Sequence, residues 1–142
     1  MPAAEELVQR MFSAIEARDW DGLAAALTPD CDFRAPGVEL RGPDGAIAWM
    51  RPFMDAFPDI HHHIGPVVAA GDGVAFELEI HGTHTAPLVT PQGELPPTQR
   101  SLGLAACNIW RLQDDGAIAA YHIYFDQVEF MVALGLVPQE GG

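Results

Sequence analysis

The sequence contains no lysine, because all seven of its basic residues are arginine. Without lysine there is no Schiff-base nucleophile, which excludes a lysine-dependent aldolase and a pyridoxal-phosphate enzyme. Positive charge is scarce overall, since the formal net charge at pH 7 is −13. Nucleic acids, anionic membranes and highly phosphorylated substrates all require a basic patch on the protein. We therefore expect no nucleic acid and no membrane as a partner.

The chain also has few cysteines and no long apolar run. Cys31 and Cys107 lie far apart with no CxxC spacing, which is typical of free, buried thiols in a reducing compartment. The N-terminus lacks the basic start and apolar block of a signal peptide, and no apolar run would span a bilayer. With 49% apolar residues in 142, the sequence predicts a single globular domain, 1–142, in the cytoplasm.

Helical spacing of apolar residues dominates the first part of the chain. It predicts a helix over 3–18, a short second helix that begins after Asp19, and a third helix over roughly 43–56. The third helix carries two wide aromatic residues and two methionines. These side chains suit the wall of a pocket, although they suit an ordinary core as well.

From residue 60 the apolar period changes to two, which predicts strands. We expect long strands over 60–69, 74–83, 100–112 and 116–126, after short strands over 31–35 and 38–40. Residues 85–98 form a long loop with few strand signals, and Phe130, Met131 and Leu134 predict a short closing helix. Helices segregated to one side of an antiparallel sheet define an α+β domain, and a twisted sheet curled around a helix leaves an apolar cavity.

The last long strand ends in polar side chains. Strict alternation places Ile118, Ala120, His122, Tyr124 and Asp126 on one face, so that an apolar strip ends in an imidazole, a phenol and a carboxylate. A carboxylate held away from water has its pKa raised, as a general base near neutral pH requires. The other interpretation is that Asp126 is the N-cap of the closing helix. The two roles exclude each other only in part.

Histidines offer two further candidate sites. In His61-His62-His63 only His61 and His63 share a face of a strand, and apart from Asp59 no nearby ligand completes a zinc site. An exposed polar strand is the simpler interpretation, and we expect no metal. His84 follows a strand beside the long loop, where it could line a cavity mouth or cap a turn.

Several short segments carry a family resemblance when they are taken together. They are Phe57–Asp59, Gly71–Ala75, Gly82–Leu88, Pro97–Arg100, Asp115–Ile118, Phe125–Asp126 and Leu134–Leu136. In this order they resemble the SnoaL-like polyketide cyclase family over essentially the whole chain. Two positions depart from the family pattern. Gln99 stands where Pro-Thr-Gly-Arg has glycine, and Tyr121-His122 stands where relatives often have His-Trp.

The resemblance implies a nuclear-transport-factor-2-like (NTF2-like) cone, which agrees with the α+β expectation. In the cyclases, an aspartate at the position of Asp126 is the acid/base residue of an intramolecular aldol ring closure that uses no metal or cofactor. The resemblance therefore favours a catalytic Asp126 over a cap. Related cones commonly pair through the outer face of the sheet, so we expect a homodimer with Glu77, Glu79 and His81 near the interface.

The resulting hypothesis is a cofactor-independent cyclase for an apolar polyketide, with Asp126 as the base. His122, Tyr124 or His84 would donate a hydrogen bond to the developing alkoxide. The side chains expected to bracket flat rings are Trp49, Phe53, Phe57 and Trp110. The alternatives are a cofactorless hydroxylase or isomerase in the same cavity, and a non-catalytic small-ligand-binding protein.

Overall fold

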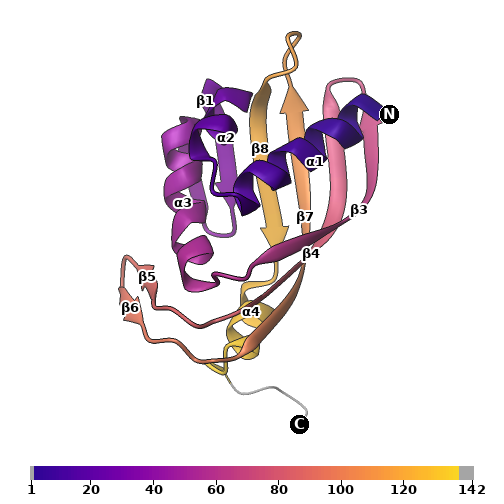
Figure 1. Cartoon of the computed structure of the whole chain (residues 1–142). Helices are drawn as coiled ribbons and strands as arrows, with labels where there is room; N and C mark the ends of the chain where they lie inside the picture. Colours follow the sequence, from indigo (N-terminus) through magenta and orange to yellow (C-terminus); the bar gives the residue numbers. More distant parts are fainter. Residues whose placement is uncertain (1, 138–142) are drawn as a thin grey trace.

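A computed structural model describes residues 2–137 as four helices and eight strands (Figure 1). The helices are α1 (Pro2–Glu16), α2 (Trp20–Ala26), α3 (Gly42–Ala56) and α4 (Gln127–Ala133). The strands are β1 (Leu27–Ala35), β2 (Val38–Arg41), β3 (His61–Ala70), β4 (Gly73–Thr83), β5 (Leu88–Thr90), β6 (Gly93–Leu95), β7 (Ser101–Leu112) and β8 (Ile118–Phe125).

Six strands form one curved sheet in the order β2-β1-β8-β7-β4-β3. All neighbours are antiparallel except β1 and β8, which run parallel. Figure 1 shows α1 crossing one face of this sheet, with α3 at the side of the β1 end and α4 below β8. The arrangement confirms the expected α+β fold, in which a mostly antiparallel sheet wraps around the N-terminal helices.

The core lies between α1 and the concave face of the sheet. Val8, Met11 and Ile15 recur at helical spacing and are all buried, so one stripe of α1 faces the sheet. On the sheet side, Trp110 is completely buried. Its indole lies 5.0 Å from the ring of Tyr121, measured between centroids. This packing fixes α1 across the middle strands and brings its last turn to the start of β3.

Residues 85–98 contain more structure than their composition predicts. Instead of an irregular loop, they form the β5–β6 hairpin, a separate two-stranded sheet. Leu88 of β5 is buried in a small cluster with Phe57 and Leu134, which explains why so short a hairpin is ordered. The hairpin therefore packs on the end of α3 and on α4.

A β-bulge changes the direction of the side chains along β8. Leu112 of β7 pairs with Ile118, but Arg111 pairs with Ala120, so Ala119 is an extra residue in β8. A shift of one residue moves every following side chain to the other face of the sheet. The alternation counted from Ile118 is therefore wrong for the rest of this strand.

After the bulge, β8 turns its apolar side chains toward the core. Tyr121 and Ile123 are buried, whereas Tyr124 is 51% exposed. His122 pairs with Ile109 of β7, which is exposed on the outer face. The imidazole and phenol that were expected inside the cone therefore lie on its outside.

Candidate functional site

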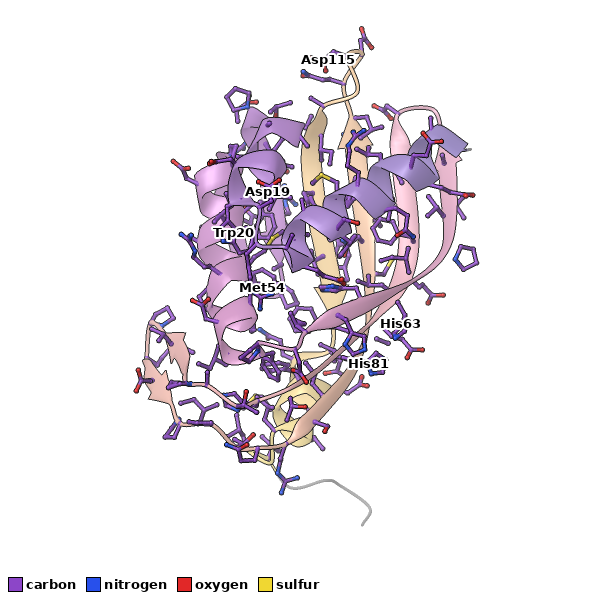
Figure 2. All side chains as sticks on the ribbon, viewed as in Figure 1. Asp19, Trp20, Met54, His63, His81 and Asp115 are labelled. Carbon is purple, nitrogen blue, oxygen red and sulfur yellow. The ribbon has the colours of Figure 1, made fainter. Side chains whose placement is uncertain are left out.

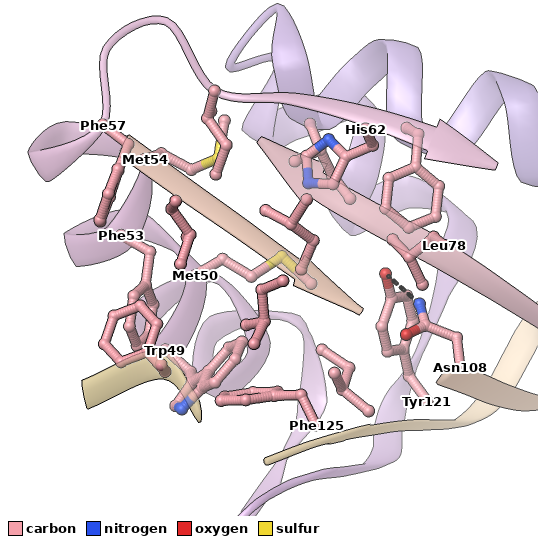
Figure 3. A pocket seen from close by; sticks show the side chains of 18 residues that line it. Trp49, Met50, Phe53, Met54, Phe57, His62, Leu78, Asn108, Tyr121 and Phe125 are labelled. Carbon is pink, nitrogen blue, oxygen red and sulfur yellow. Dashed lines mark hydrogen bonds between the residues drawn. The ribbon is translucent and has the colours of Figure 1, made fainter. Parts of the chain in front are cut away.

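A cavity opens between α1, α3 and the concave face of the sheet (Figure 3). The enclosed part of the cavity has a volume of about 90 Å³, and the space that includes its open mouth is about 690 Å³. We call this small cavity the slot.

The walls of the slot are almost entirely apolar. They are formed by Phe12, Ile15, Trp49, Met50, Phe53, Met54, Phe57, Ile60, His62, Leu78, Ile80, Leu102, Leu104, Asn108, Tyr121, Ile123, Phe125 and Phe130. Figure 3 shows the polar side chains His62, Asn108 and Tyr121 at one end and Trp49, Phe53 and Phe57 at the other. A ligand that fills this cavity therefore meets its polar contacts at one end only.

His62 is the basic group of the polar end. Its side chain is only 7% exposed, and its Nδ1 lies 2.9 Å from Oε2 of Glu16, the last residue of α1. The backbone N–H of His62 donates to the same oxygen at 2.8 Å. A carboxylate only accepts hydrogen bonds, so neutral His62 carries its proton on Nδ1. Its Nε2 is then a bare acceptor, and the ring lines the cavity.

Burial determines the protonation state of His62. Loss of solvent lowers the pKa of this imidazole below its ordinary value, although the Glu16 carboxylate acts in the opposite direction. The ring of Phe12 lies 4.9 Å from the imidazole and contributes to its dry surroundings. His62 is therefore neutral at pH 7, the state in which an imidazole accepts a proton.

Asn108 and Tyr121 form the second polar feature of the same end. The amide of Asn108 donates to the Tyr121 hydroxyl at 3.4 Å, shown as the dashed line in Figure 3. Complete burial raises the pKa of Tyr121, so its phenol stays protonated. Because the hydroxyl oxygen accepts from Asn108, its own hydrogen is free to be donated to a ligand.

Three of the expected ring-binding residues line the cavity. Trp49, Phe53 and Phe57 all come from α3 or the residue that follows it, and the rings of Trp49 and Phe53 are 4.8 Å apart. The prediction that Trp110 lines the cavity beside them is wrong. Its indole is buried in the core behind Tyr121. The alternation of β7 does turn Trp110 inward, but Phe12 and Phe76 cover it.

Asp126 is not the buried carboxylate that the strand pattern predicted. It is exposed and caps α4, because its Oδ1 accepts from the backbone N–H of Val128 at 2.8 Å and of Glu129 at 3.3 Å. It is also absent from the walls of the cavity. The bulge at Ala119 is the physical reason, since it turns this end of the β8 alternation outward.

The other polar residues expected in the site lie elsewhere. His122 is on the outer face, with its Nε2 3.4 Å from Oδ2 of Asp32, and Tyr124 is exposed beside it. His84 is completely buried, but at the base of the hairpin rather than on the cavity wall. There its Nδ1 accepts from the backbone N–H of Thr98 at 3.2 Å, so it closes a turn.

The neighbours of His62 in sequence point away from the cavity. His61 and His63 are exposed, and with His81 they form an outer cluster whose ring centroids are 5.2 to 5.5 Å apart. Figure 2 shows His63 and His81 close together on the outside of the sheet. Across residues 2–137, no group of three or more His, Cys, Asp or Glu side chains has an arrangement that would hold a metal ion.

The sequence alternation contained the signal for His62. It placed His62 on the face opposite His61 and His63, together with Ile60 and Ile64, which is the inner face of a half-buried strand. Its partner Glu16 lies 46 residues earlier, and no local pattern connects the two.

Among the described helices, none has the length and apolar character needed to cross a membrane.

The cone, its apolar slot and the imidazole of His62 on the wall of that slot define a class of α+β domains with an internal cavity. Residues 8–121 match the family described as the SnoaL-like domain. The chain therefore belongs to the SnoaL-like family, which confirms the resemblance carried by its short motifs. No curated protein sequence matches the chain significantly.

Solved structures of similar shape support the same fold. AclR from Streptomyces galilaeus, a proposed hydroxylase, is 22% identical with a TM-score of 0.81, covering 97% of this chain and 99% of its own. A proposed SnoaL-like polyketide cyclase from Jannaschia sp. CCS1 is 22% identical with a TM-score of 0.81, and the match covers 95% of this chain and 93% of the cyclase chain. TerC, co-crystallised with polyporic acid, is 16% identical with a TM-score of 0.72, and the match covers 93% of this chain and 98% of the TerC chain. At these identities the likeness establishes the fold alone.

Proposed function

We propose that this protein is a cofactor-independent cyclase that closes a ring in an apolar, carbonyl-rich molecule by an intramolecular aldol reaction. In this proposal His62, not Asp126, is the base. The observation that carries it is the neutral imidazole of His62, whose Nδ1 is bonded to Glu16 and whose ring lines a slot of apolar side chains. A polyketide-like substrate is the chemical class that fits such a slot.

The reaction needs no group beyond the substrate and the side chains. Nε2 of His62 takes a proton from a carbon that lies between two carbonyl groups. The enolate carbon then attacks a ketone of the same molecule, so one carbon–carbon bond forms and the ketone oxygen becomes an alkoxide. The protonated His62 returns its proton to that alkoxide, and the product is an isomer of the substrate.

Tyr121 supplies the hydrogen bond that the enolate requires. Its hydroxyl remains protonated and its oxygen is already engaged by Asn108, so the hydrogen can point toward an oxygen of the substrate. A donor in a dry site stabilises developing negative charge more strongly than a donor in water does. The flat rings of the substrate would lie between Trp49, Phe53 and Phe57, which hold the reacting carbons together.

The test uses a neutral naphthyl-substituted 1,3,7-triketone as a probe, in which C2 lies between two carbonyl groups and can close a six-membered ring on the C7 ketone. Ring closure is followed by chromatography and mass spectrometry. We expect His62→Gln to lower the rate about 100-fold or more, which is the usual contribution of a general base. His63→Gln is the matched control, because it changes the adjacent imidazole on the outer face and should leave the rate unchanged. A His62→Gln variant as active as the parent chain would overturn the assignment.

Product mass and structure together separate the alternatives, because an isomerase also leaves the mass of the probe unchanged but closes no ring. Aldol closure leaves the mass of the probe unchanged, whereas a hydroxylase adds one oxygen atom and consumes oxygen. A binding protein would retain the probe, quench the fluorescence of Trp49 and return it unaltered. Hydroxylation begins with the same proton abstraction, so His62→Gln should abolish that activity as well.

We also propose that two copies associate through the outer face of the sheet. Ile109 and Tyr124 are exposed there, close to the charged Glu77 and Glu79 of β4. Exposed apolar side chains rimmed by polar ones are typical of an interface between proteins. Sedimentation velocity should give a dimer for the parent chain and a monomer for Ile109→Glu. A parent chain that sediments as a monomer at all concentrations would contradict this proposal.

A further inference from the structure

Glu16 stands at the boundary between the cavity and the solvent. Its side chain is 36% exposed, whereas the imidazole that it contacts is 7% exposed. The ring of His62 thus separates an apolar slot on one side from a carboxylate in contact with water on the other. Such a carboxylate retains part of its hydration.

Both hydrogen bonds from His62 end on the same atom of Glu16. Oε2 accepts from the backbone N–H of His62 at 2.8 Å and from Nδ1 at 2.9 Å. The backbone N–H is a fixed donor of β3, so it holds the carboxylate in place independently of the imidazole. This geometry aligns Oε2 with Nδ1 and leaves the opposite nitrogen for the cavity.

The end of α1 is itself tied to its surroundings by Arg18. One guanidinium nitrogen donates to the backbone oxygen of Glu16 at 2.9 Å, and another donates to the oxygen of Met54 at 2.9 Å and of Pro58 at 3.3 Å. These bonds join the last turn of α1 to the end of α3 and to the segment that leads into β3. Glu16 therefore has a defined position relative to His62.

We propose that Glu16 is a positioning residue for His62. It fixes the tautomer with the proton on Nδ1, so that Nε2 faces the cavity as an acceptor, and it stabilises the imidazolium that forms when Nε2 takes a proton. The catalytic part of this inference rests on the proposed function, but the effect on the imidazole does not. The charged or titratable groups around this pair are Arg18 at the end of α1 and His61 on the same strand.

The variant Glu16→Gln separates charge from structure. The glutamine carbonyl oxygen can still accept from the backbone N–H of His62 and from Nδ1, so the fold is retained. The negative charge is lost, so the imidazolium loses its counter-charge. If Glu16 only caps a backbone N–H, this change should leave the imidazole as it was.

The first measurement is nitrogen NMR of labelled histidine across a pH titration, without any substrate. We expect Glu16→Gln to lower the pKa of His62 below that of the parent chain while the Nδ1–H tautomer is retained. Glu16→Ala, which also removes the acceptor, should reduce the population of that tautomer. Glu6→Gln is the control, because Glu6 is exposed on the same helix and should change neither quantity. An unchanged titration of His62 in Glu16→Gln, or an unchanged tautomer in Glu16→Ala, would overturn the inference.

The second measurement is ring closure of the naphthyl 1,3,7-triketone. Glu16 lies behind the imidazole and does not line the cavity, so its loss should lower kcat about tenfold or more while KM stays close to that of the parent chain. A rise in KM with kcat unchanged would contradict a positioning role. If the parent chain closes no ring at all, the proposed function fails, and the NMR titration still decides the role of Glu16.

Discussion

Replacement of Asp126 distinguishes between the two roles that this residue could have. The structure makes it the N-cap of α4, since Oδ1 accepts from the backbone N–H groups of Val128 and Glu129. Loss of such a cap costs about 1 kcal/mol. For a chain of 142 residues, an unfolding entropy of about 2.1 cal/mol/K per residue gives about 300 cal/mol/K in total. We therefore expect Asp126→Ala to lower Tm by about 3 °C.

Asp126→Asn is the informative companion to that variant. The asparagine side chain retains an oxygen that can accept both N–H groups, so it should cost about 0.5 kcal/mol or less. Neither change should slow ring closure, because Asp126 is exposed and does not line the cavity. Thermal unfolding followed by circular dichroism gives the stability, and the triketone ring-closure assay gives the activity.

The opposite result would restore the catalytic role of Asp126. If Asp126→Asn abolished ring closure and Asp126→Ala left Tm unchanged, the carboxylate would act on the substrate and the cap would be incidental. His62→Gln in the same assay provides the reference for a lost base. If Asp126 is a cap, only His62→Gln should abolish ring closure. If Asp126 is the base, Asp126→Asn should abolish it instead.

Three further predictions concern other parts of the molecule. Gln99 has φ +62°, a conformation that favours glycine, so Gln99→Gly should raise the unfolding free energy by about 0.5 kcal/mol in a urea titration. Cys31 is buried and its pKa is raised to about 11, so mass spectrometry should find iodoacetamide on Cys107 long before Cys31, and equal labelling would contradict the packing. Burial lowers the pKa of His84, so the unfolded state binds its proton more readily and stability should fall as the pH drops below about 6.5. His84→Asn, whose side-chain oxygen can replace Nδ1, should weaken this loss, and an unchanged pH dependence of the unfolding free energy would contradict it.

The sequence could predict the elements of this fold because their signals are local. The spacing of Val8, Met11 and Ile15 defines one face of α1, and the period of two defines β4 and β7. The β5–β6 hairpin was missed because its strands have three residues each and are stabilised by Leu88 packing on α3, a contact distant in sequence. Local patterns do not contain information of that kind.

The candidate site could be predicted only in part. Trp49, Phe53 and Phe57 share one helix, so their common placement follows from helical geometry. The polar residues of β8 were assigned to the wrong face because an extra residue at Ala119 reverses the alternation. Nothing in the composition of an alanine-rich stretch marks a bulge at that position.

The bulge also determines what chemistry the cavity can perform. It turns Tyr121 inward and His122 outward, so β8 contributes a phenol that donates a hydrogen bond and no base. In the proposed reaction the base therefore comes from another strand, β3, as His62. Because no arginine lines the slot, a substrate carboxylate would find no counter-charge there, and burial of an unpaired charge is costly. The substrate of the proposed reaction is therefore uncharged, and the two polar groups at one end of the cavity would orient it.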